Sequence, residues 1–186
     1  MKVLVSGSSG HLGEALVRTL NRQGHAVVGV DVVQSPFTTH VGSITSRAVA
    51  RACMRGVEAV LHTATLHKPH VFTHSPQAFV DANITGTLNL LEEAVAANVR
   101  AFIFTSTTSA FGNALTPPPG KPAAWITEEI APQPKNIYAS PRRRQKISAN
   151  CSAGTRACLA LYFARPASSP SRTTTRSHAA RTQMPI

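Results

Sequence analysis

The chain has 186 residues, enough for one domain with a hydrophobic core, and a formal net charge of +11. The charge is uneven, because residues 1–138 hold ten basic and eight acidic side chains, whereas residues 139–186 hold nine basic side chains and no acidic one. The first part is therefore nearly neutral, which argues against a nucleic-acid-binding surface on the folded domain.

The cysteines and the N-terminus indicate the compartment. Cys53, Cys151 and Cys158 are an odd number of thiols at no metal-ligand spacing, which predicts free thiols in a reducing environment. The first apolar run, Val3 to Val5, is interrupted after three residues and is too short for a signal peptide or a membrane span. We therefore expect a cytoplasmic protein without a membrane partner.

Short apolar runs alternate with stretches of helical periodicity along residues 1–106. In chain order we expect a strand at 3–5, a helix at 12–23, a strand at 26–33, a short strand at 41–44, a helix ending near Arg55, a strand at 57–62, a helix at 78–98 and a strand at 101–106. Strands that alternate with helices predict an α/β fold with a doubly wound parallel sheet, a Rossmann fold. The proline-rich stretch 113–136 is expected to be a long loop, of the kind that is functional or mobile.

Three glycines, Gly7, Gly10 and Gly13, form a G-x-x-G-x-x-G pattern between the first predicted strand and the first predicted helix. Glycine is needed there because a side chain would keep the backbone away from a dinucleotide pyrophosphate. The helix N-terminus adds unpaired N–H groups and about half a positive charge. The pattern predicts a dinucleotide-binding loop. Its other expected contacts are Ser9, His11 and Leu12.

An acidic residue near the end of the second predicted strand indicates which dinucleotide is bound. Asp31 follows Gly13 by 18 residues, where a carboxylate can accept hydrogen bonds from the ribose hydroxyls. The same carboxylate would repel a 2′-phosphate, so the expected cofactor is NAD and not NADP. The alternative is an exposed acid at a strand end with no ligand. Ser43 and Ile44, after the third strand, are expected to flank the adenine.

Several further motifs resemble the extended short-chain dehydrogenase/reductase family, the NAD-dependent epimerase/dehydratase group. The resemblance covers Met1 to about Tyr138. Besides the glycine pattern, the matching segments are His62-Thr63-Ala64, Asn83-Ile84-Thr85-Gly86-Thr87, Phe104-Thr105-Ser106-Thr107 with Phe111-Gly112, and Asn136-Ile137-Tyr138. The resemblance implies the sheet order 3-2-1-4-5 and a passage of the Ala64 backbone beside the cofactor.

The resemblance also implies a chemistry, namely oxidation, reduction or epimerisation at a carbinol carbon of a small, nucleotide-sugar-like substrate. Thr107 takes the family's catalytic Ser/Thr position, and Tyr138 takes the place of the catalytic tyrosine. A tyrosine with a pKa near 10 is a poor base at neutral pH without a nearby cation, which the family supplies with a lysine four residues on. A strand-end threonine and a loop tyrosine are the plainer alternatives. The family often dimerises, so a homodimer is one assembly that the resemblance implies.

The pattern breaks after Tyr138. Arg142 stands where the family has its lysine, and a forked guanidinium does not replace an ammonium group. Pro141 fits only the first turn of the helix expected there. Restoring one lost nucleotide near codon 139 lets the following residues decode as GVTK and then as an acid-containing helix. We therefore interpret residues 139–186 as frameshifted.

The expected architecture is an NAD-binding Rossmann domain over residues 1–138, followed by a disordered basic tail over residues 139–186. The fold is then C-terminally truncated, because the tail replaces the family's substrate-binding half and leaves the fifth strand as a bare edge. Two functions follow from this. The chain is either an epimerase/dehydratase-type oxidoreductase with impaired turnover or a non-catalytic NAD-binding remnant or sensor.

Two other readings are weaker. Basic residues 142–146 are a candidate nucleic-acid arm, but the tail lacks the interleaved aromatic side chains that stack on bases. His62, His67, His70 and His74 are candidate zinc ligands, but Pro69 interrupts their helix and no acidic residue or cysteine lies nearby in the sequence. We expect neither a nucleic-acid partner nor a metal.

Overall fold

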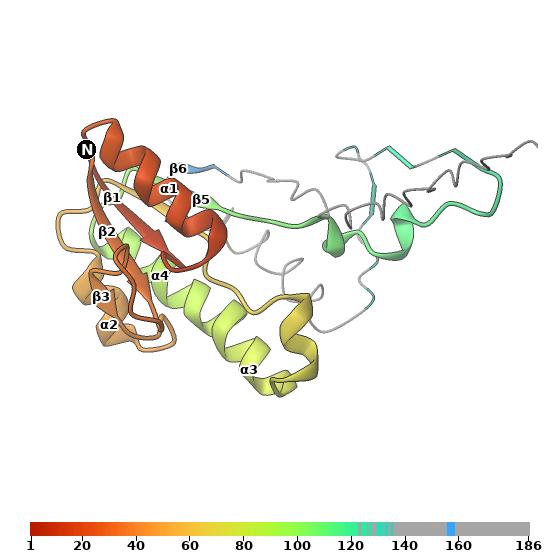
Figure 1. Ribbon diagram of the computed structural model, residues 1–186, viewed down its shortest axis with the longest axis horizontal. Helices are drawn as coiled ribbons and strands as arrows, with labels where there is room; N and C mark the ends of the chain where they lie inside the picture. Colours follow the sequence, from red (N-terminus) through yellow and green to blue (C-terminus); the bar gives the residue numbers. More distant parts are fainter. Residues whose placement is uncertain are drawn as a thin grey trace, which may run out of the picture.

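A parallel sheet forms the centre of the part of the chain that the computed structural model describes, namely residues 1–122, 124–125, 127, 130–131, 133, 135 and 156–158 (Figure 1). Its strands lie in the order β3-β2-β1-β4-β5-β6. They are β1 Lys2–Ser6, β2 Ala26–Asp31, β3 His40–Val41, β4 Ala59–His62, β5 Ala101–Phe104 and β6 Arg156–Cys158. Neighbouring strands pair in parallel. The predicted α/β fold and the order of the first five strands are confirmed.

Helices cover both faces of this sheet. They are α1 His11–Arg22, α2 Arg47–Cys53, α3 Pro76–Val80 and α4 Gly86–Ala96, with a π-helical turn, η2 Asp81–Thr85, between α3 and α4. Short 3₁₀ segments are η1 Lys68–Phe72, η3 Thr108–Ala110 and η4 Asn113–Leu115. α1 packs on β1 and β2, and α2 and α4 lie side by side across the sheet from α1 (Figure 1).

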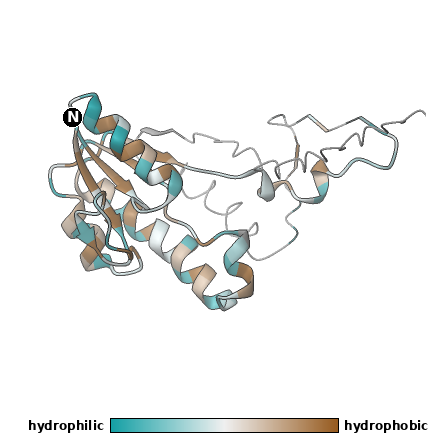
Figure 2. Ribbon diagram, viewed as in Figure 1, coloured by the Kyte–Doolittle hydropathy of each residue, from teal (hydrophilic) through white to brown (hydrophobic). Residues whose placement is uncertain are grey.

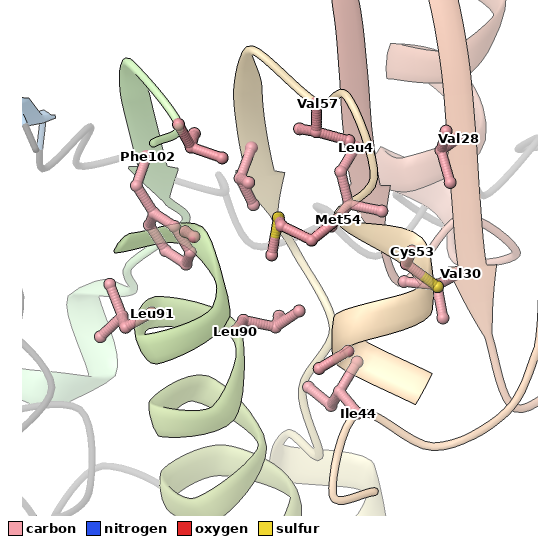
Figure 3. Close-up of a cluster of buried hydrophobic side chains, with 14 of the residues drawn as sticks. Leu4, Val28, Val30, Ile44, Cys53, Met54, Val57, Leu90, Leu91 and Phe102 are labelled. Carbon is pink, nitrogen blue, oxygen red and sulfur yellow. The ribbon is translucent and has the colours of Figure 1, made fainter. Parts of the chain in front are cut away.

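The main hydrophobic core lies between the sheet and helices α2 and α4 (Figure 3). Side chains alternate along a strand, so Leu4 of β1 faces this core while its neighbours Val3 and Val5 face α1. Figure 2 shows the strands as apolar and the outer surface of α1 as largely hydrophilic. Burying each leucine such as Leu4 or Leu90 contributes about 1.5–3 kcal/mol. The core holds the carboxyl ends of β1, β2 and β4 in fixed relative positions.

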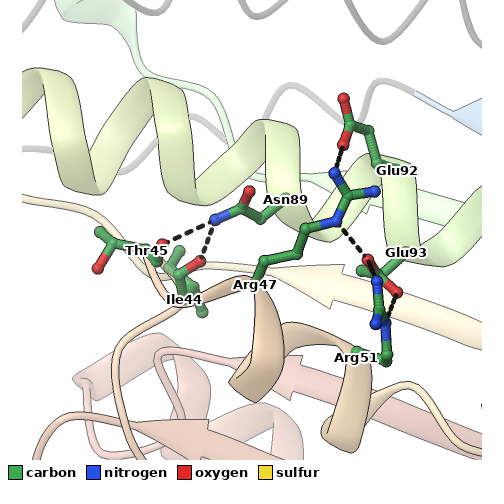
Figure 4. Close-up of polar contacts among 7 residues, drawn as sticks. All are labelled: Ile44, Thr45, Arg47, Arg51, Asn89, Glu92 and Glu93. Carbon is green, nitrogen blue, oxygen red and sulfur yellow. Dashed lines mark hydrogen bonds and ion pairs between the residues drawn. The ribbon is translucent and has the colours of Figure 1, made fainter.

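α2 and α4 are also joined by ion pairs (Figure 4). Glu93 of α4 is almost fully buried and accepts from Arg47 Nε at 2.7 Å and Arg51 Nε at 3.1 Å. These hydrogen bonds, that from Arg51 first, lower the pKa of the Glu93 carboxyl. Arg47 also contacts Glu92. The two arginines keep this buried carboxylate charged.

Several predicted elements end differently from expectation, and among them the third strand ends at Val41 and not at residue 44, and the fifth at Phe104 and not at residue 106. The second strand was expected to reach Val33 but ends at Asp31, and Val32 and Val33 are 65% and 56% exposed. The reason is local, because the Asp31 side chain accepts the Val33 N–H at 3.0 Å and turns the chain. The helix expected at 78–98 begins at Pro76 and is interrupted by the π-helical turn Asp81–Thr85.

The expectation of a bare edge at the fifth strand was wrong. β6 pairs with β5 from Ala101↔Arg156 to Ile103↔Cys158. An unpaired edge leaves main-chain N–H and C=O groups without partners, and this three-residue strand from the predicted tail supplies them. The rest of that tail, residues 139–155 and 159–186, lies outside the described residues, and so does the prediction that it is disordered.

Candidate functional site

Two glycines of the loop between β1 and α1 are required by the fold itself. Gly7 has φ +76°, and a Cβ there would lie 2.7 Å from the Ala64 nitrogen. Its N–H donates to the Val30 carbonyl at 2.8 Å, which ties the loop to β2. A Cβ at Gly13 would lie only 1.9 Å from the Gly7 carbonyl oxygen. Gly7 therefore lets the loop meet β4, and Gly13 lets α1 start close against the loop.

The middle glycine has a different environment. Gly10 is exposed, with an ordinary extended backbone at φ −76° and ψ 160°. Apart from the chain neighbours Ser9 and His11, the one atom of the described residues within 4 Å of a Cβ built there is the Gly7 carbonyl oxygen, at 3.3 Å, a tight contact. The fold by itself therefore needs a glycine here less than at Gly7 or Gly13, because a shift of a few tenths of an ångström would relieve this contact. Gly10 is also the N-cap of α1 and makes no side-chain cap, so the first turn of the helix presents its N–H groups outward.

Asp31, at the end of β2, meets Ser9 of the glycine loop, which lies 22 residues earlier in the chain. The Ser9 N–H donates to Asp31 Oδ2 at 3.0 Å, and the Val33 N–H donates to Oδ1 at 3.0 Å. Each carboxylate oxygen has two acceptor positions, so both keep one position for a further donor. The half-buried carboxylate therefore lies beside the helix N-terminus, as a ribose ligand next to a pyrophosphate site requires.

Side-chain hydroxyls of the β2–β3 loop, which the sequence did not reveal, hold the glycine loop in place. Ser9 Oγ lies 2.8 Å from Thr38 Oγ1, 3.1 Å from Ser35 Oγ and 2.8 Å from the Val33 carbonyl oxygen. Ser8 Oγ also contacts Thr38 Oγ1, at 3.0 Å. The predicted Ser9 side chain is thus engaged with the β2–β3 loop, and its backbone N–H with Asp31. Ser and Thr in both loops were the only sequence signal of this network.

The segment after β4 passes directly beside Gly7. Its course is held by Asn83 of the π-helical turn, which is 1% exposed. Asn83 Oδ1 accepts the Leu66 N–H at 2.9 Å, and Nδ2 donates to the Leu66 carbonyl at 2.9 Å. Thr65 Oγ1 donates to the same Oδ1 at 3.0 Å. The structure therefore brings Ala64 to the glycine loop, and Asn83 was not named as a site residue from the sequence.

The remaining predicted cofactor contacts differ in exposure. His11 is exposed and Leu12 half-buried in the first turn of α1. Ser43 Oγ contacts Thr45 Oγ1 at 2.8 Å. Ile44 is 7% exposed and belongs to the core, so little of its side chain is exposed to an adenine. Asn89 of α4 donates to the Ile44 and Thr45 carbonyls at 3.0 and 2.9 Å (Figure 4).

Thr107 lies three residues beyond β5 and caps the 3₁₀ segment Thr108–Ala110. Its Oγ1 accepts the Ser109 N–H at 3.3 Å, which leaves the hydroxyl proton available for donation. Just beyond, Gly112 has φ +48°, and the Asn113 N–H donates to the Gln133 carbonyl at 3.0 Å. This hydrogen bond places Gln133 beside Gly112, the last residue of the strand-five motif. Tyr138 and Arg142 lie outside the described residues.

The histidines do not form a metal site in the described part of the chain. His67, His70 and His74 stack edge to face, with ring centroids 4.6 and 5.2 Å apart. No group of three His, Cys, Asp or Glu side chains within the described ranges is placed to hold a metal ion.

Burial raises the pKa of the Cys53 thiol to about 11. Across the same described residues, none of the helices has the length and apolar character needed to span a bilayer.

The parallel sheet, the glycine loop and the acidic residue that ends β2 define a dinucleotide-binding protein of the Rossmann class. Residues 3–163 match the NAD dependent epimerase/dehydratase family, and the chain belongs to that family. The matched span includes residues 139–163, beyond the predicted boundary at residue 138. That boundary stays a prediction.

Three of the curated relatives are longer than this chain. It is 32% identical to UDP-glucose 4-epimerase of Erwinia amylovora over 129 residues, which cover 60% of this chain and 38% of the relative. It is 33% identical to 3-beta-hydroxysteroid dehydrogenase of Mycolicibacterium neoaurum over 118 residues, 58% of this chain and 32% of the relative. A match to the protein CapI of Staphylococcus aureus covers 49% of that protein. The chain thus spans half or less of the length of these relatives.

Solved structures show the same fold. A short-chain dehydrogenase/reductase superfamily protein from Agrobacterium tumefaciens with bound NAD has a TM-score of 0.72 and 26% identity, covering 86% of this chain and 48% of that one. A UDP-glucose 4-epimerase has a TM-score of 0.74 and 26% identity, covering 88% of this chain and 51% of that one. A Thermotoga maritima UDP-glucose 4-epimerase with UDP-glucose has a TM-score of 0.75 at 24% identity, covering 87% of this chain and 55% of that one, and supports the fold alone.

Proposed function

We propose that this chain binds NAD at the loop from Gly7 to Gly13 and belongs to an oxidoreductase that acts on a carbinol carbon of a nucleotide-sugar-like substrate. The observation that carries the proposal is Gly10. It is the N-cap of α1, it is exposed, and among the described residues other than its chain neighbours a Cβ there would meet one atom, the Gly7 carbonyl oxygen at 3.3 Å. A glycine that the fold needs less than it needs Gly7 and Gly13 is explained by a ligand that approaches the backbone there.

The surrounding residues fit a dinucleotide. The uncapped first turn of α1 offers N–H donors and the positive end of the helix dipole to a pyrophosphate. Asp31 has acceptor positions left for ribose hydroxyls and repels a phosphate at the 2′ position, which favours NAD over NADP. The NAD-bound Agrobacterium tumefaciens protein, at 26% identity, supports the same cofactor.

NAD, when bound, accepts a hydride from the carbon that bears the substrate hydroxyl or returns one to it. Thr107 would donate its free hydroxyl proton to the substrate oxygen, because its own oxygen already accepts the Ser109 N–H. By family resemblance, Tyr138 would take or give the proton of the substrate hydroxyl. With Arg142 at the lysine position, the tyrosine lacks the ammonium group that lowers its pKa in the family. We therefore propose that turnover by this chain is impaired.

The substrate class is supported by the UDP-glucose 4-epimerases among the relatives. The 3-beta-hydroxysteroid dehydrogenases share the chemistry at a hydroxyl-bearing carbon but not the substrate. A second candidate function, a non-catalytic NAD-binding remnant or sensor, rests on Arg142. The two candidates share NAD binding and differ in turnover, so they are separated by incubating the purified chain with NAD and UDP-sugars and measuring both net NAD reduction and conversion of the UDP-sugar to its epimer. The gene sequence near codon 139 tests whether residues 139–186 are frameshifted.

The direct test of the cofactor site is calorimetric titration of the 186-residue chain and of Gly10→Ala with NAD. We expect the variant to bind at least about tenfold more weakly, since a methyl group then stands between loop and ligand. Its melting temperature should change little, because the poorer N-cap and the stiffer unfolded chain are effects of similar size and opposite sign. Ser46→Ala, at the equally uncapped N-cap of α2, is the matched control and should leave the affinity unchanged. Equal affinities for Gly10→Ala and the unmodified chain would contradict the proposal.

A further inference from the structure

A chain of hydrogen bonds centred on His62, the last residue of β4, lies beneath the glycine loop. His62 is 1% exposed. Its Nδ1 lies 2.6 Å from Ser6 Oγ at the end of β1, and its Nε2 lies 2.8 Å from Thr87 Oγ1 in the first turn of α4. The ring packs against Phe102 and Phe104 at centroid distances of 5.9 and 5.3 Å. The proposed chemistry gives this buried imidazole no part.

The proton positions along this chain follow from one carbonyl. Thr87 Oγ1 lies 2.9 Å from the Asn83 carbonyl oxygen, which can only accept, so the single Thr87 proton points there. The Thr87 oxygen is then the acceptor for His62, and Nε2 carries the imidazole proton. A neutral imidazole has one donor and one acceptor nitrogen, so Nδ1 accepts the Ser6 hydroxyl proton. Burial among aromatic rings disfavours the charged imidazolium.

The Ser6 end of the chain reaches the cofactor loop. Once its hydroxyl proton is committed to His62, Ser6 Oγ accepts the Ala64 N–H at 3.4 Å. The Ser6 carbonyl accepts both the N–H of Thr63, at 3.1 Å, and its hydroxyl, at 2.6 Å. The Ala64 nitrogen is the atom nearest to a Cβ built on Gly7, at 2.7 Å. The distance between the glycine turn and the segment after β4 is therefore set at Ser6.

We propose that His62 is a positioning residue of the cofactor site. As the neutral Nε2–H tautomer it fixes the Ser6 hydroxyl, which holds the Ala64 backbone against Gly7, while Thr87 fixes the ring from the other side. In this role His62 acts on the cofactor site through Ser6. The inference rests on the proposed NAD site for its consequence, which is a preorganised surface beside the dinucleotide.

The first test uses the unmodified chain without cofactor. Nitrogen NMR of the labelled imidazoles should show His62 neutral at pH 7, with the proton on Nε2. A proton on Nδ1, or an imidazolium at pH 7, would overturn the assignment. Because this measurement needs no variant and no ligand, it is independent of whether substitutions at this position fold.

The second test uses three variants to separate the hydrogen bond of Nδ1 from that of Nε2. His62→Ala removes the hydrogen bonds of both ring nitrogens. His62→Asn restores an acceptor near the Nδ1 position, and His62→Gln restores a donor near the Nε2 position. We expect amide exchange at Ala64 to speed up by about tenfold or more in the Ala and Gln variants and to return within about threefold of the original rate in the Asn variant. NAD affinity should fall by about tenfold in the same two variants and recover in His62→Asn.

Val99→Ala, a buried core deletion away from this hydrogen-bond chain, measures what lost stability alone does to Ala64 exchange. Equal exchange in His62→Asn and His62→Ala, or an effect in His62→Ala no larger than in Val99→Ala, would overturn the positioning role. If the unmodified chain does not bind NAD but shows the exchange pattern, the proposed function fails and the hydrogen-bond role of His62 stands. If it binds NAD and all variants bind equally, the positioning role fails alone.

Discussion

Replacing Asp31 by asparagine should change which dinucleotide the chain prefers. The Asp31 carboxylate accepts two main-chain N–H groups at 3.0 Å and keeps one acceptor position on each oxygen. A hydrogen bond to a charged group contributes about 1.5–3 kcal/mol, so weakening the ribose contact should lower NAD affinity by roughly tenfold to a hundredfold. The neutral amide also removes the repulsion of a 2′-phosphate, which is about 4 kcal/mol for one unit charge at 4 Å near a protein surface. NADP affinity should therefore rise relative to NAD.

The assay is calorimetric titration of the Asp31→Asn chain with NAD and with NADP at one fixed ionic strength. Glu14→Gln is the matched control, because it removes one carboxylate in the first turn of α1 that pairs with Arg18 and has no predicted ribose contact. This control should alter both affinities in the same direction and leave their ratio unchanged. An unchanged NAD-to-NADP ratio in Asp31→Asn, in a variant that melts like the unmodified chain, would refute the role assigned to this carboxylate.

Three further predictions concern the fold. Gly13→Ala places a methyl carbon 1.9 Å from the Gly7 carbonyl oxygen and should lower the free energy of unfolding by about 2 kcal/mol or more, seen as a lower urea midpoint; an unchanged midpoint would contradict it. The lowered pKa of Glu93 means that its contribution to stability is present above the ordinary value of 4.5 and is lost as the pH falls through the folded-state pKa. The urea midpoints of Glu93→Gln and the unmodified chain should therefore differ most near pH 7 and converge in acid. Cys53, with a pKa raised to about 11 by burial, should be alkylated slowly at pH 8 in the folded chain, and rapid labelling of its peptide by mass spectrometry would show that it is not buried.

The sheet and the glycine loop could be predicted because their signals are local. Apolar runs such as Val3 to Val5 mark buried strands, and glycines at fixed offsets mark the tight turn into α1. The end of β2 was missed because an Asp side chain, and not a change in hydrophobicity, turns the chain after Asp31. The π-helical turn Asp81–Thr85 was missed because it keeps the helical pattern of its neighbours.

Partners that are far apart in the sequence were beyond prediction. The sequence places His62 in a family motif and among candidate metal ligands, yet it contacts Ser6 and Thr87, 56 and 25 residues away. The hydroxyls that hold Ser9 likewise come from the loop after β2, and hydroxyl spacing in a single sequence carries no periodicity that would reveal them. β6 could not be expected, because Arg156–Cys158 is only three residues long and shows no alternation that marks a strand.

The measurement that tests the cofactor site most directly is amide hydrogen exchange of the 186-residue chain with and without NAD. Phosphates bound at the start of α1 would accept hydrogen bonds from the amides of His11, Leu12 and Gly13, so NAD should slow exchange at these positions and leave α2 unaffected. No slowing at these three amides with millimolar NAD would contradict the site.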